Sequence, residues 1–177
     1  MPQNRYWTLI SLMLGGSLLD QGSKWLVKAY LSPTVSLPIL PNVFQLTLSY
    51  NTGAAFSMFR QQPQLLAGFT VLLFCALLIY AVRKQYYYRG ELTAMGLILG
   101  GALGNLLDRL LWGKVTDFLD VVIIRYPIFN IADSLIFIGV LWLVLLYLRQ
   151  PNTSQPSNNN EVSVCPTPSH DVPTCTR

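Results

Sequence analysis

Apolar residues along the chain are gathered into four long blocks that are separated by polar connections. An α-helix rises about 1.5 Å per residue, so an apolar helix of about 20 residues spans a bilayer core about 30 Å thick. The pattern therefore predicts four transmembrane helices. They cover residues 6–25, 65–82, 92–107 and 129–148.

The two long connections between these blocks contain further predicted elements. From Phe44 to Tyr50, apolar and polar residues alternate strictly, which is typical of a strand with one apolar face. In the second connection, the β-branched run 121–124 precedes Tyr126 and Pro127, and we expect either another strand or a flap there. A small sheet on the membrane surface would accommodate such strands.

The C-terminal part of the chain differs in composition from the rest. Residues 150–177 are dominated by Pro, Asn, Ser and Thr and contain hardly any aliphatic side chain. Such a segment cannot offset the entropy cost of ordering, so we expect a disordered polar tail without chemistry. Residues 1–149 then form a four-span membrane domain. The predicted fold class is an all-α membrane protein with four transmembrane helices and a small extracytoplasmic β-sheet and loop region.

Overall composition also argues against a soluble enzyme. Hydrophobic residues make up 52% of the chain and charged residues only 11%, whereas about a quarter of an ordinary soluble domain is charged. The net charge of +4 comes from scattered or juxtamembrane Lys and Arg, so we expect no nucleic-acid partner. Equal numbers of Lys and Arg fall on the two sides of the membrane in the predicted topology. However, Arg83, Lys84 and Arg89 crowd one short turn, and basic residues are enriched on the cytoplasmic side. We therefore expect this turn and both termini to face the cytoplasm.

Cysteine and histidine offer little for catalysis. Cys75 lies in an apolar block, whereas Cys165, Cys175 and the single histidine, His170, lie in the polar tail. No pair has metal-ligand spacing, so we expect no metal, no other cofactor and no His-based nucleophile.

Five of the eight acidic residues fall near the outer leaflet in the predicted topology. Ionisable groups at membrane depth are costly and usually functional, although any single one can also serve as a helix cap. Two neighbouring aspartates can share one proton, so that one activates water and the other acts as the acid. A dyad of Ser57 and Lys24 is an alternative, but it needs a neutral lysine, and a carboxylate one turn away disfavours that. The five residues are Asp20, Asp108, Asp117, Asp120 and Asp133.

The third block carries a ridge of small residues. Gly96, Gly100 and Gly104 recur every four residues, which favours close packing of another helix over direct contact with a ligand. The next position on this ridge is Asp108, so packing would press its carboxylate against neighbouring polar groups. The residues that share a second face are Gly101, Asn105 and Asp108.

Two other blocks carry polar pairs at helical spacing. Asn130 and Asp133 are three residues apart and therefore lie on one side of the fourth block. Asp20 and Lys24 are four apart and can form an intrahelical ion pair.

Five sequence motifs, in order and at suitable spacing, resemble those of the lipoprotein signal peptidases, the type II signal peptidases of bacteria. The resemblance runs from about residue 6 to residue 148. Each motif alone is a weak signal, but five in sequence on a predicted four-span protein identify the family. They are D-Q-G-S-K (20–24), N-T-G-A-A-F-S (51–57), G-G-A-L-G-N-L-L-D-R (100–109), V-T-D-F (115–118) and F-N-I-A-D-S (129–134).

The resemblance implies an aspartyl endopeptidase of the bacterial inner membrane, which removes the signal peptide of prolipoproteins just before the diacylglyceryl-modified cysteine. It implies that Asp117 and Asp133 form the catalytic dyad, whereas Asp120 belongs to no motif and is a surface acid. Expected partners are lipidated prolipoproteins, membrane lipids and inhibitory globomycin-like cyclic peptides. The other motif residues expected in or beside the site are Asp20, Lys24, Asn51, Gly53, Gly101, Asn105, Asp108, Arg109, Asn130 and Ala132.

Two non-enzymatic functions are the alternatives. A small proton or ion carrier would also place acids in membrane helices, but a relay needs ionisable residues spaced across the bilayer. Here the inner halves of the predicted spans carry none, which favours a one-sided site near the outer leaflet. A scaffold protein would explain the glycine ridge but not the converging Asp and Asn residues.

Overall fold

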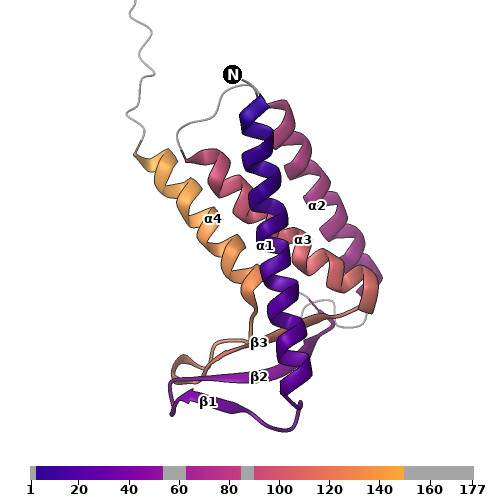
Figure 1. Ribbon diagram of the computed structural model, residues 1–177, viewed down its shortest axis with the longest axis vertical. Coiled ribbons are helices and arrows are strands. Elements are labelled where there is room, and N and C mark those ends of the chain that lie inside the picture. The colour runs from indigo at the N-terminus through magenta and orange to yellow at the C-terminus, as the bar shows by residue number, and fades with distance from the viewer. Residues whose placement is uncertain (1–2, 54–62, 85–89, 150–177) are drawn as a thin grey trace, which may run out of the picture.

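The computed structural model describes residues 3–53, 63–84 and 90–149. They form four long helices and a three-stranded antiparallel sheet at one end of the helices (Figure 1). The predictions for Ser57 and for the tail from residue 150 lie outside the described residues. In chain order the elements are α1 (Gln3–Tyr30), β1 (Leu37–Leu40), β2 (Phe44–Asn51), α2 (Pro63–Arg83), α3 (Glu91–Trp112), β3 (Val115–Val121), the 3₁₀ helix η2 (Val122–Ile124) and α4 (Ile131–Leu148).

The four helices coincide with the four apolar blocks, and two of them are long and apolar enough to cross a membrane. These are α3 and α4. The most apolar stretch of α4 has a mean hydropathy of 2.4, yet only 11% of it is buried within the protein. Side chains such as Phe137 and Leu148 are 68% and 76% exposed, which suits a helix that faces lipid. Because only these two described helices meet both criteria, the count of four transmembrane helices stays a prediction.

Two helices continue past the aspartates that the sequence pattern places at their ends. Asp20 lies well inside α1, which reaches Tyr30, and Asp108 lies inside α3, which reaches Trp112. Both carboxylates are fully buried and paired with Lys24. Because Lys24 replaces water around each carboxylate, both helices can continue past their aspartate.

The glycine ridge of α3 packs against α1, as predicted. Gly96 lies against the side chain of Leu12, and Gly100 lies against the backbone of Gly16. At Gly104, an added Cβ would come within 2.5 Å of the Asp20 carboxylate. These close approaches let α1 present its polar residues directly to the polar face of α3.

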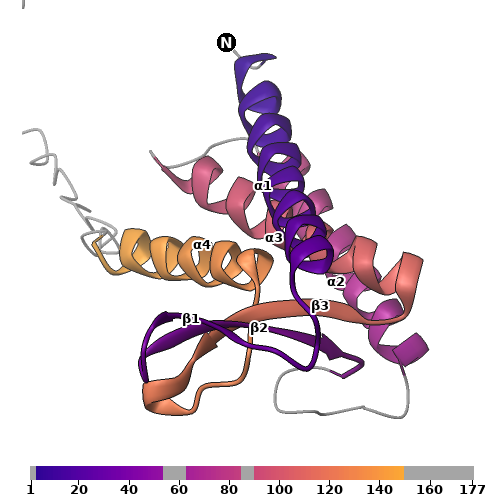
Figure 2. The same cartoon turned by 60° about the horizontal axis from the view of Figure 1, so that its bottom comes forward.

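The sheet lies across one end of the helices, with strand order β1-β2-β3 (Figure 2). The predicted alternating strand is confirmed as β2, whose buried Leu48 packs with Val27 of α1 and Phe118 of β3. The pairing of β2 with β3 places Ser49 opposite Asp117. Backbone bonds from Phe118 and Leu119 to the carbonyl of Phe129 then tie β3 to the segment that leads into α4.

The prediction of a strand over residues 121–124 is wrong except at Val121, because residues 122–124 form the 3₁₀ helix η2. The strand lies earlier in the chain, in β3, and places Asp117 and Asp120 on a strand instead of in a loop. The ladder of β2 and β3 ends at the pair of Phe44 and Val121, and one further backbone bond, from the N–H of Val122 to the carbonyl of Val43, follows it. The chain turns there through η2, with Arg125 in the left-handed region at φ 49°. The flap alternative stays a prediction.

Candidate active site

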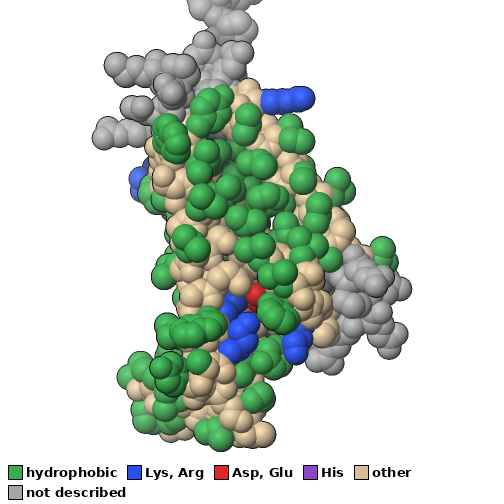
Figure 3. All heavy atoms as spheres, turned by 45° about the vertical axis from the view of Figure 1, so that its right-hand side comes forward, with side chains coloured by type: hydrophobic (Ala, Val, Ile, Leu, Met, Phe, Trp, Pro, Cys, Tyr) green, Lys and Arg blue, Asp and Glu red, His purple; other side chains and the backbone are tan. Residues whose placement is uncertain are grey.

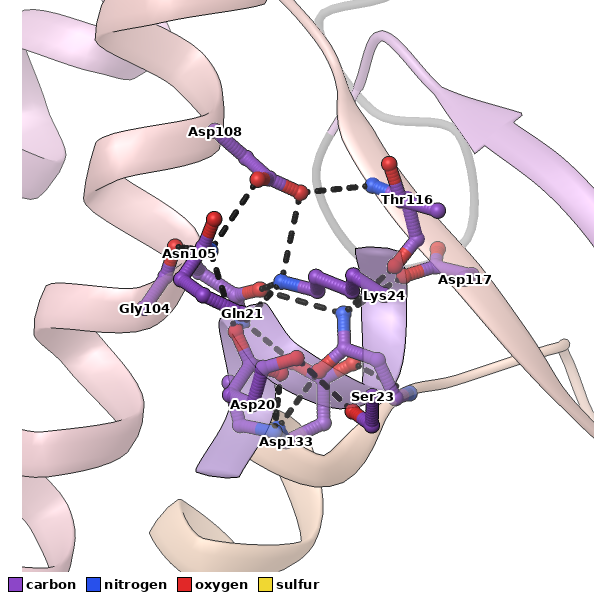
Figure 4. Close-up of polar contacts among 12 residues, drawn as sticks. Asp20, Gln21, Ser23, Lys24, Gly104, Asn105, Asp108, Thr116, Asp117 and Asp133 are labelled. Carbon is purple, nitrogen blue, oxygen red and sulfur yellow. Dashed lines mark hydrogen bonds and ion pairs between the residues drawn. The ribbon is translucent and has the colours of Figure 1, made fainter. Parts of the chain in front are cut away.

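A fully buried lysine is the centre of a polar network at the sheet end of the helices (Figure 4). Lys24 Nζ lies 2.7 Å from Asp20 Oδ2 and 3.2 Å from Asp108 Oδ2, and donates a 3.0 Å hydrogen bond to Asn105 Oδ1. The predicted ion pair between Asp20 and Lys24 is confirmed, and it belongs to a larger network. A buried charge is tolerated only when it is paired and hydrogen-bonded, and both conditions are met here.

The two carboxylates of this network also hold backbone groups of other elements. Asp20 Oδ1 accepts a 2.9 Å bond from the N–H of Ala132 in the first turn of α4. Asp108 Oδ2 accepts a 2.9 Å bond from the N–H of Thr116 in β3. The network therefore fixes α1, α3, β3 and α4 relative to one another. Such bonds to orphan N–H groups at a helix start stabilise the helix as well.

Gln21 is a member of the network that the sequence analysis did not single out. Its Nε2 donates to the carbonyl of Gly104 at 2.9 Å and to Asp108 Oδ1 at 3.1 Å. The only sequence signal is its position next to Asp20 within the first motif. A single sequence does not reveal that this side chain crosses to α3.

Two asparagine side chains connect Asp117 with Asp133. Asn130 Nδ2 donates to Asp117 Oδ1 at 2.7 Å and to Asn105 Oδ1 at 3.0 Å. Asn105 Nδ2 in turn donates to Asp133 Oδ1 at 2.7 Å. An amide both donates and accepts, so each asparagine can bridge groups of opposite hydrogen-bonding character. Figure 4 shows side chains from α1, α3, β3 and α4 converging here.

Asp133 is also part of the cap that begins α4. Asn130 Oδ1 accepts from the N–H of Asp133 at 2.9 Å, and Asp133 Oδ2 accepts from the N–H of Asn130 at 3.2 Å. This reciprocal arrangement is a capping box. Both carboxylate oxygens of Asp133 therefore accept hydrogen bonds, and the positive end of the helix dipole favours its negative charge.

Asp117 and Asp133 both line one cavity of about 240 Å³. Burial raises the pKa of Asp117 to about 7, the negative charge of Asp133 acts in the same direction, and hydrogen bonds from Asn130 and Asn51 oppose it. One carboxyl group that holds a proton near neutral pH, beside a second carboxylate, is suited to acid–base catalysis. Among the described residues, no group of three His, Cys, Asp or Glu side chains is placed to hold a metal ion.

The other expected site residues fall into two groups. Asn51 and Arg109 line the same cavity as the two aspartates. Asn51 Oδ1 accepts a 2.9 Å bond from the N–H of Gly53, which orders the end of β2. Gly101 and Ala132 do not line the cavity: they meet where α3 crosses α4, and a side chain at Gly101 would collide with the Ala132 carbonyl.

Asp120 lies apart from the site, although it is only three residues from Asp117. Its Oδ2 accepts hydrogen bonds from Gln45 Nε2 at 2.7 Å and from Thr47 Oγ1 at 3.0 Å. Successive residues of a strand point to opposite faces, so an odd spacing directs the two aspartates in opposite directions. Both of these partners belong to β2.

Two apolar spaces adjoin the polar cavity and share Asp133 with it. One, of about 430 Å³, lies between the first turns of α4 and the segment 121–129, with Tyr126 and Phe129 on the border with the polar cavity. The other, of about 330 Å³, is a groove between α2, α3 and α4 that includes Phe69 and Leu73. Both spaces are lined mainly by hydrophobic side chains, and both reach Asp133.

Comparisons with known proteins agree with this architecture. The family model for signal peptidase (SPase) II matches residues 12–149. The lipoprotein signal peptidase of Dehalococcoides mccartyi is 40% identical over 149 residues, which cover 82% of this chain and 91% of that protein. The lipoprotein signal peptidase of Gloeobacter violaceus is 42% identical over 149 residues, with 84% and 86% covered.

Solved structures show the same likeness in three dimensions. A bacterial membrane enzyme solved at 2.3 Å aligns with a TM-score of 0.76 at 29% identity and covers 84% of this chain and 92% of its own. A second, solved at 1.9 Å, aligns with a TM-score of 0.72 at 31% identity, with 81% and 94% covered. On the extent of these matches, the chain belongs to the signal peptidase II family.

Proposed function

We propose that this protein is an aspartyl endopeptidase that removes the signal peptide from diacylglyceryl-modified prolipoproteins and cuts just before the lipidated cysteine. Asp117 and Asp133 are its catalytic residues. The observation that carries this proposal is that both carboxylates line one cavity and are connected through Asn130 and Asn105. Family membership supplies the substrate class.

The different surroundings of the two aspartates assign their roles in this proposal. Asp133, with both oxygens accepting hydrogen bonds at the start of α4, is the base that takes a proton from water. Asp117, whose pKa of about 7 keeps it protonated up to neutral pH, gives its proton to the oxygen of the scissile carbonyl. The water oxygen bonds to the carbonyl carbon, and a tetrahedral diol forms.

Collapse of the diol completes the reaction. The C–N bond breaks, and the leaving amine takes the proton held by Asp133. One diol hydroxyl returns its proton to Asp117 as the new carboxyl group forms. Both aspartates then have their starting protonation states. Asn51 and Arg109 line the cavity as donors for the substrate backbone.

The adjoining apolar spaces suit a lipidated substrate. The groove between α2, α3 and α4 accommodates the apolar signal helix, and the space beneath residues 121–129 accommodates acyl chains. Because both include Asp133, the two apolar parts of the substrate extend from the point where the peptide bond is cut. Membrane lipids would occupy the same spaces when no substrate is bound.

The arrangement of aromatic and basic residues supports a site near the outer leaflet. Trp7 and Trp25 of α1 are both exposed, and their spacing in the helix corresponds to about 27 Å, close to the thickness of a bilayer core. Along α1, Asp20 and Lys24 lie within about two turns of Trp25 and far from Trp7. Figure 3 shows hydrophobic side chains over the helices, with Lys and Arg gathered where the helices meet the sheet. We place this end outside the cytoplasm and both termini inside.

Cleavage of a lipidated precursor and of the same precursor without lipid tests the proposal. We expect cleavage of the lipidated form only, at the bond before the modified cysteine, as read by mass spectrometry. A globomycin-like cyclic peptide should inhibit it, and a chelator should have no effect. Equal cleavage of both precursors, or loss of activity with the chelator, would contradict the proposal. Asp117→Asn serves as the inactive control.

A further inference from the structure

A second polar cluster lies at the end of the helices opposite the proposed site, and the proposed reaction does not use it. Lys84, just after α2, forms an ion pair with the buried Glu91 at the start of α3. Tyr147, near the end of α4, donates a 2.9 Å hydrogen bond to the same Glu91 Oε1. Lys84 Nζ also donates to the hydroxyl groups of Tyr80 and Tyr147, at 3.2 and 3.3 Å. The cluster thus connects the ends of three helices.

The packing of α2 differs between its two halves. Its second half contributes Phe74, Leu77, Leu78 and Ala81 to a hydrophobic core cluster with α1 and α3. Among the described residues, that cluster takes no α2 side chain from the first half. The groove that leads to Asp133 borders the middle of the helix, from Phe69 to Leu77. The helix is therefore anchored near Lys84, and the part that borders the groove extends away from this anchor.

We infer that Lys84, Glu91 and Tyr147 are positioning residues that hold α2 against α3 and α4 and thereby set the width of the groove along which the signal helix reaches Asp133. Phe69, at the far end of the groove-lining part of α2, lies about 22 Å along the chain direction from Lys84. A small rotation at the anchored end therefore moves Phe69 further than it moves the side chains close to Lys84. The inference rests on the proposed function for the identity of the ligand. It does not give these residues any contact with the reacting atoms.

Steady-state kinetics on a lipidated precursor test this inference. In Lys84→Met the ion pair is lost and α2 is less firmly held. We expect KM to rise by about 3- to 30-fold, the range over which residues remote from a site modulate binding, with kcat nearly unchanged. Arg83→Gln is the matched control, because Arg83 is the exposed neighbour at the same helix end; its KM should equal that of the wild type. The charge-swapped pair Lys84→Glu with Glu91→Lys should restore a low KM.

A milder substitution covers the case in which Lys84→Met does not fold. Tyr147→Phe removes one hydroxyl group and its bonds to Glu91 and Lys84 but keeps the ring. We expect a smaller rise of KM in the same direction, again without loss of kcat. A merely stabilising role would instead lower the amount of folded enzyme and leave the KM of the surviving fraction unchanged.

A distance measurement provides a readout that does not depend on activity. Spin labels at Leu72→Cys in α2 and Val140→Cys in α4, both exposed positions, would report the separation of the two helices. The three native cysteines are replaced by Ser beforehand. We expect a longer and broader distance distribution with Lys84→Met and an unchanged one with Arg83→Gln.

The outcomes separate this inference from the proposed function. If the wild type does not cleave the lipidated precursor, the proposed function fails, and the distance measurement still tests the anchoring of α2. If the wild type cleaves it but Lys84→Met and Tyr147→Phe leave both KM and the distance distribution unchanged, the inference is wrong. A fall in kcat at constant KM would also overturn it.

Discussion

The two ends of the helix bundle both bury charged side chains, but in different proportions. At the sheet end, the described polar network and its cavity contain four carboxylates and two cations: Asp20, Asp108, Asp117 and Asp133 with Lys24 and Arg109. At the opposite end, one carboxylate, Glu91, is paired with one lysine, Lys84. The first end also contains a cavity of about 240 Å³ among these groups.

The difference in charge balance favours the sheet end as the proposed catalytic site. In the balanced pair of Lys84 and Glu91, the lysine charge stabilises the carboxylate, which therefore does not take up an additional proton. Such a pair can connect helices but is not suited to exchange protons with a substrate. A surplus of buried carboxylates cannot all remain ionised, because like charges in a poorly solvated space repel one another. The sheet end therefore keeps a proton near neutral pH, on Asp117.

Removal of either carboxylate of the proposed dyad should have the largest effect. Asp117→Asn and Asp133→Asn each preserve shape but eliminate a proton donor or acceptor. General acid–base catalysis contributes about 100- to 10,000-fold per group, so we expect turnover to fall by that factor or more in a folded, membrane-inserted protein. Cleavage assays and thermal unfolding in detergent measure the two properties separately. Normal turnover in either variant would exclude that residue from catalysis.

Loss of the central lysine should distinguish the two ends by stability. Lys24→Met leaves Asp20 and Asp108 buried without their cation, and breaking a buried pair in this way costs about 3–5 kcal/mol. Lys84→Met should cost less, because the Lys84 side chain is 19% exposed, whereas that of Lys24 is fully buried. Unfolding of both variants under the same conditions tests the order. A larger loss for Lys84→Met would reverse our ranking of the two ends.

The pH dependence of activity should reflect the surplus carboxylate. Asp117 must be protonated to act as the acid, and burial raises its pKa to about 7. We therefore expect kcat/KM to fall by roughly tenfold per pH unit well above pH 7. A profile that is flat from neutral to alkaline pH would assign the proton to another group.

The same proton should affect stability, in a direction fixed by linkage. The folded protein binds the Asp117 proton more tightly than the unfolded chain, in which the carboxyl group has its ordinary pKa of 3.8. This contribution to stability is fully present below about pH 4 and is lost as the pH rises through 7. Thermal unfolding of Asp117→Asn should therefore show a weaker decline of Tm over this range than the wild type.

The smallest effect is expected at Asp120. Its carboxylate accepts hydrogen bonds from Gln45 and Thr47 on the other face of the sheet. An Asn side chain retains an acceptor there, so Asp120→Asn should change the free energy of unfolding by no more than about 0.5 kcal/mol and leave turnover normal. Collapse of activity in this variant, with normal activity in Asp117→Asn, would show that the other aspartate of β3 is catalytic.

The helices were predictable from the sequence because a long apolar block identifies a helix without knowledge of its partners. The strand β2 was predictable for a similar reason, since its alternation is local. The strand β3 was not: V-T-D-F-L-D-V lacks strict alternation, and its conformation depends on pairing with β2. The neighbouring run 121–124 has higher strand propensity, but the chain turns through η2 just after the ladder ends, so the tertiary context outweighs the propensity.

The site was predictable as a set of residues but not as a set of contacts. Helical spacing indicated the pair of Asp20 and Lys24, and the motifs indicated the two central asparagines. The bridge from Gln21 to Asp108 and the contact of Lys84 with Glu91 join separate helices, so no local pattern reveals them. The assignment of catalysis to Asp117 and Asp133 was made from the resemblance and stays a prediction.

The capping box at Asn130 and Asp133 makes the start of α4 and the assembly of the dyad a single event. Asn130 is the cap and Asp133 lies in the first turn of that helix, so fraying of this turn separates the proposed base from the asparagine that bonds to its proposed acid partner. A chain whose last helix has not yet formed its first turn therefore carries every residue of the proposed dyad without holding them in the arrangement that the proposed reaction needs.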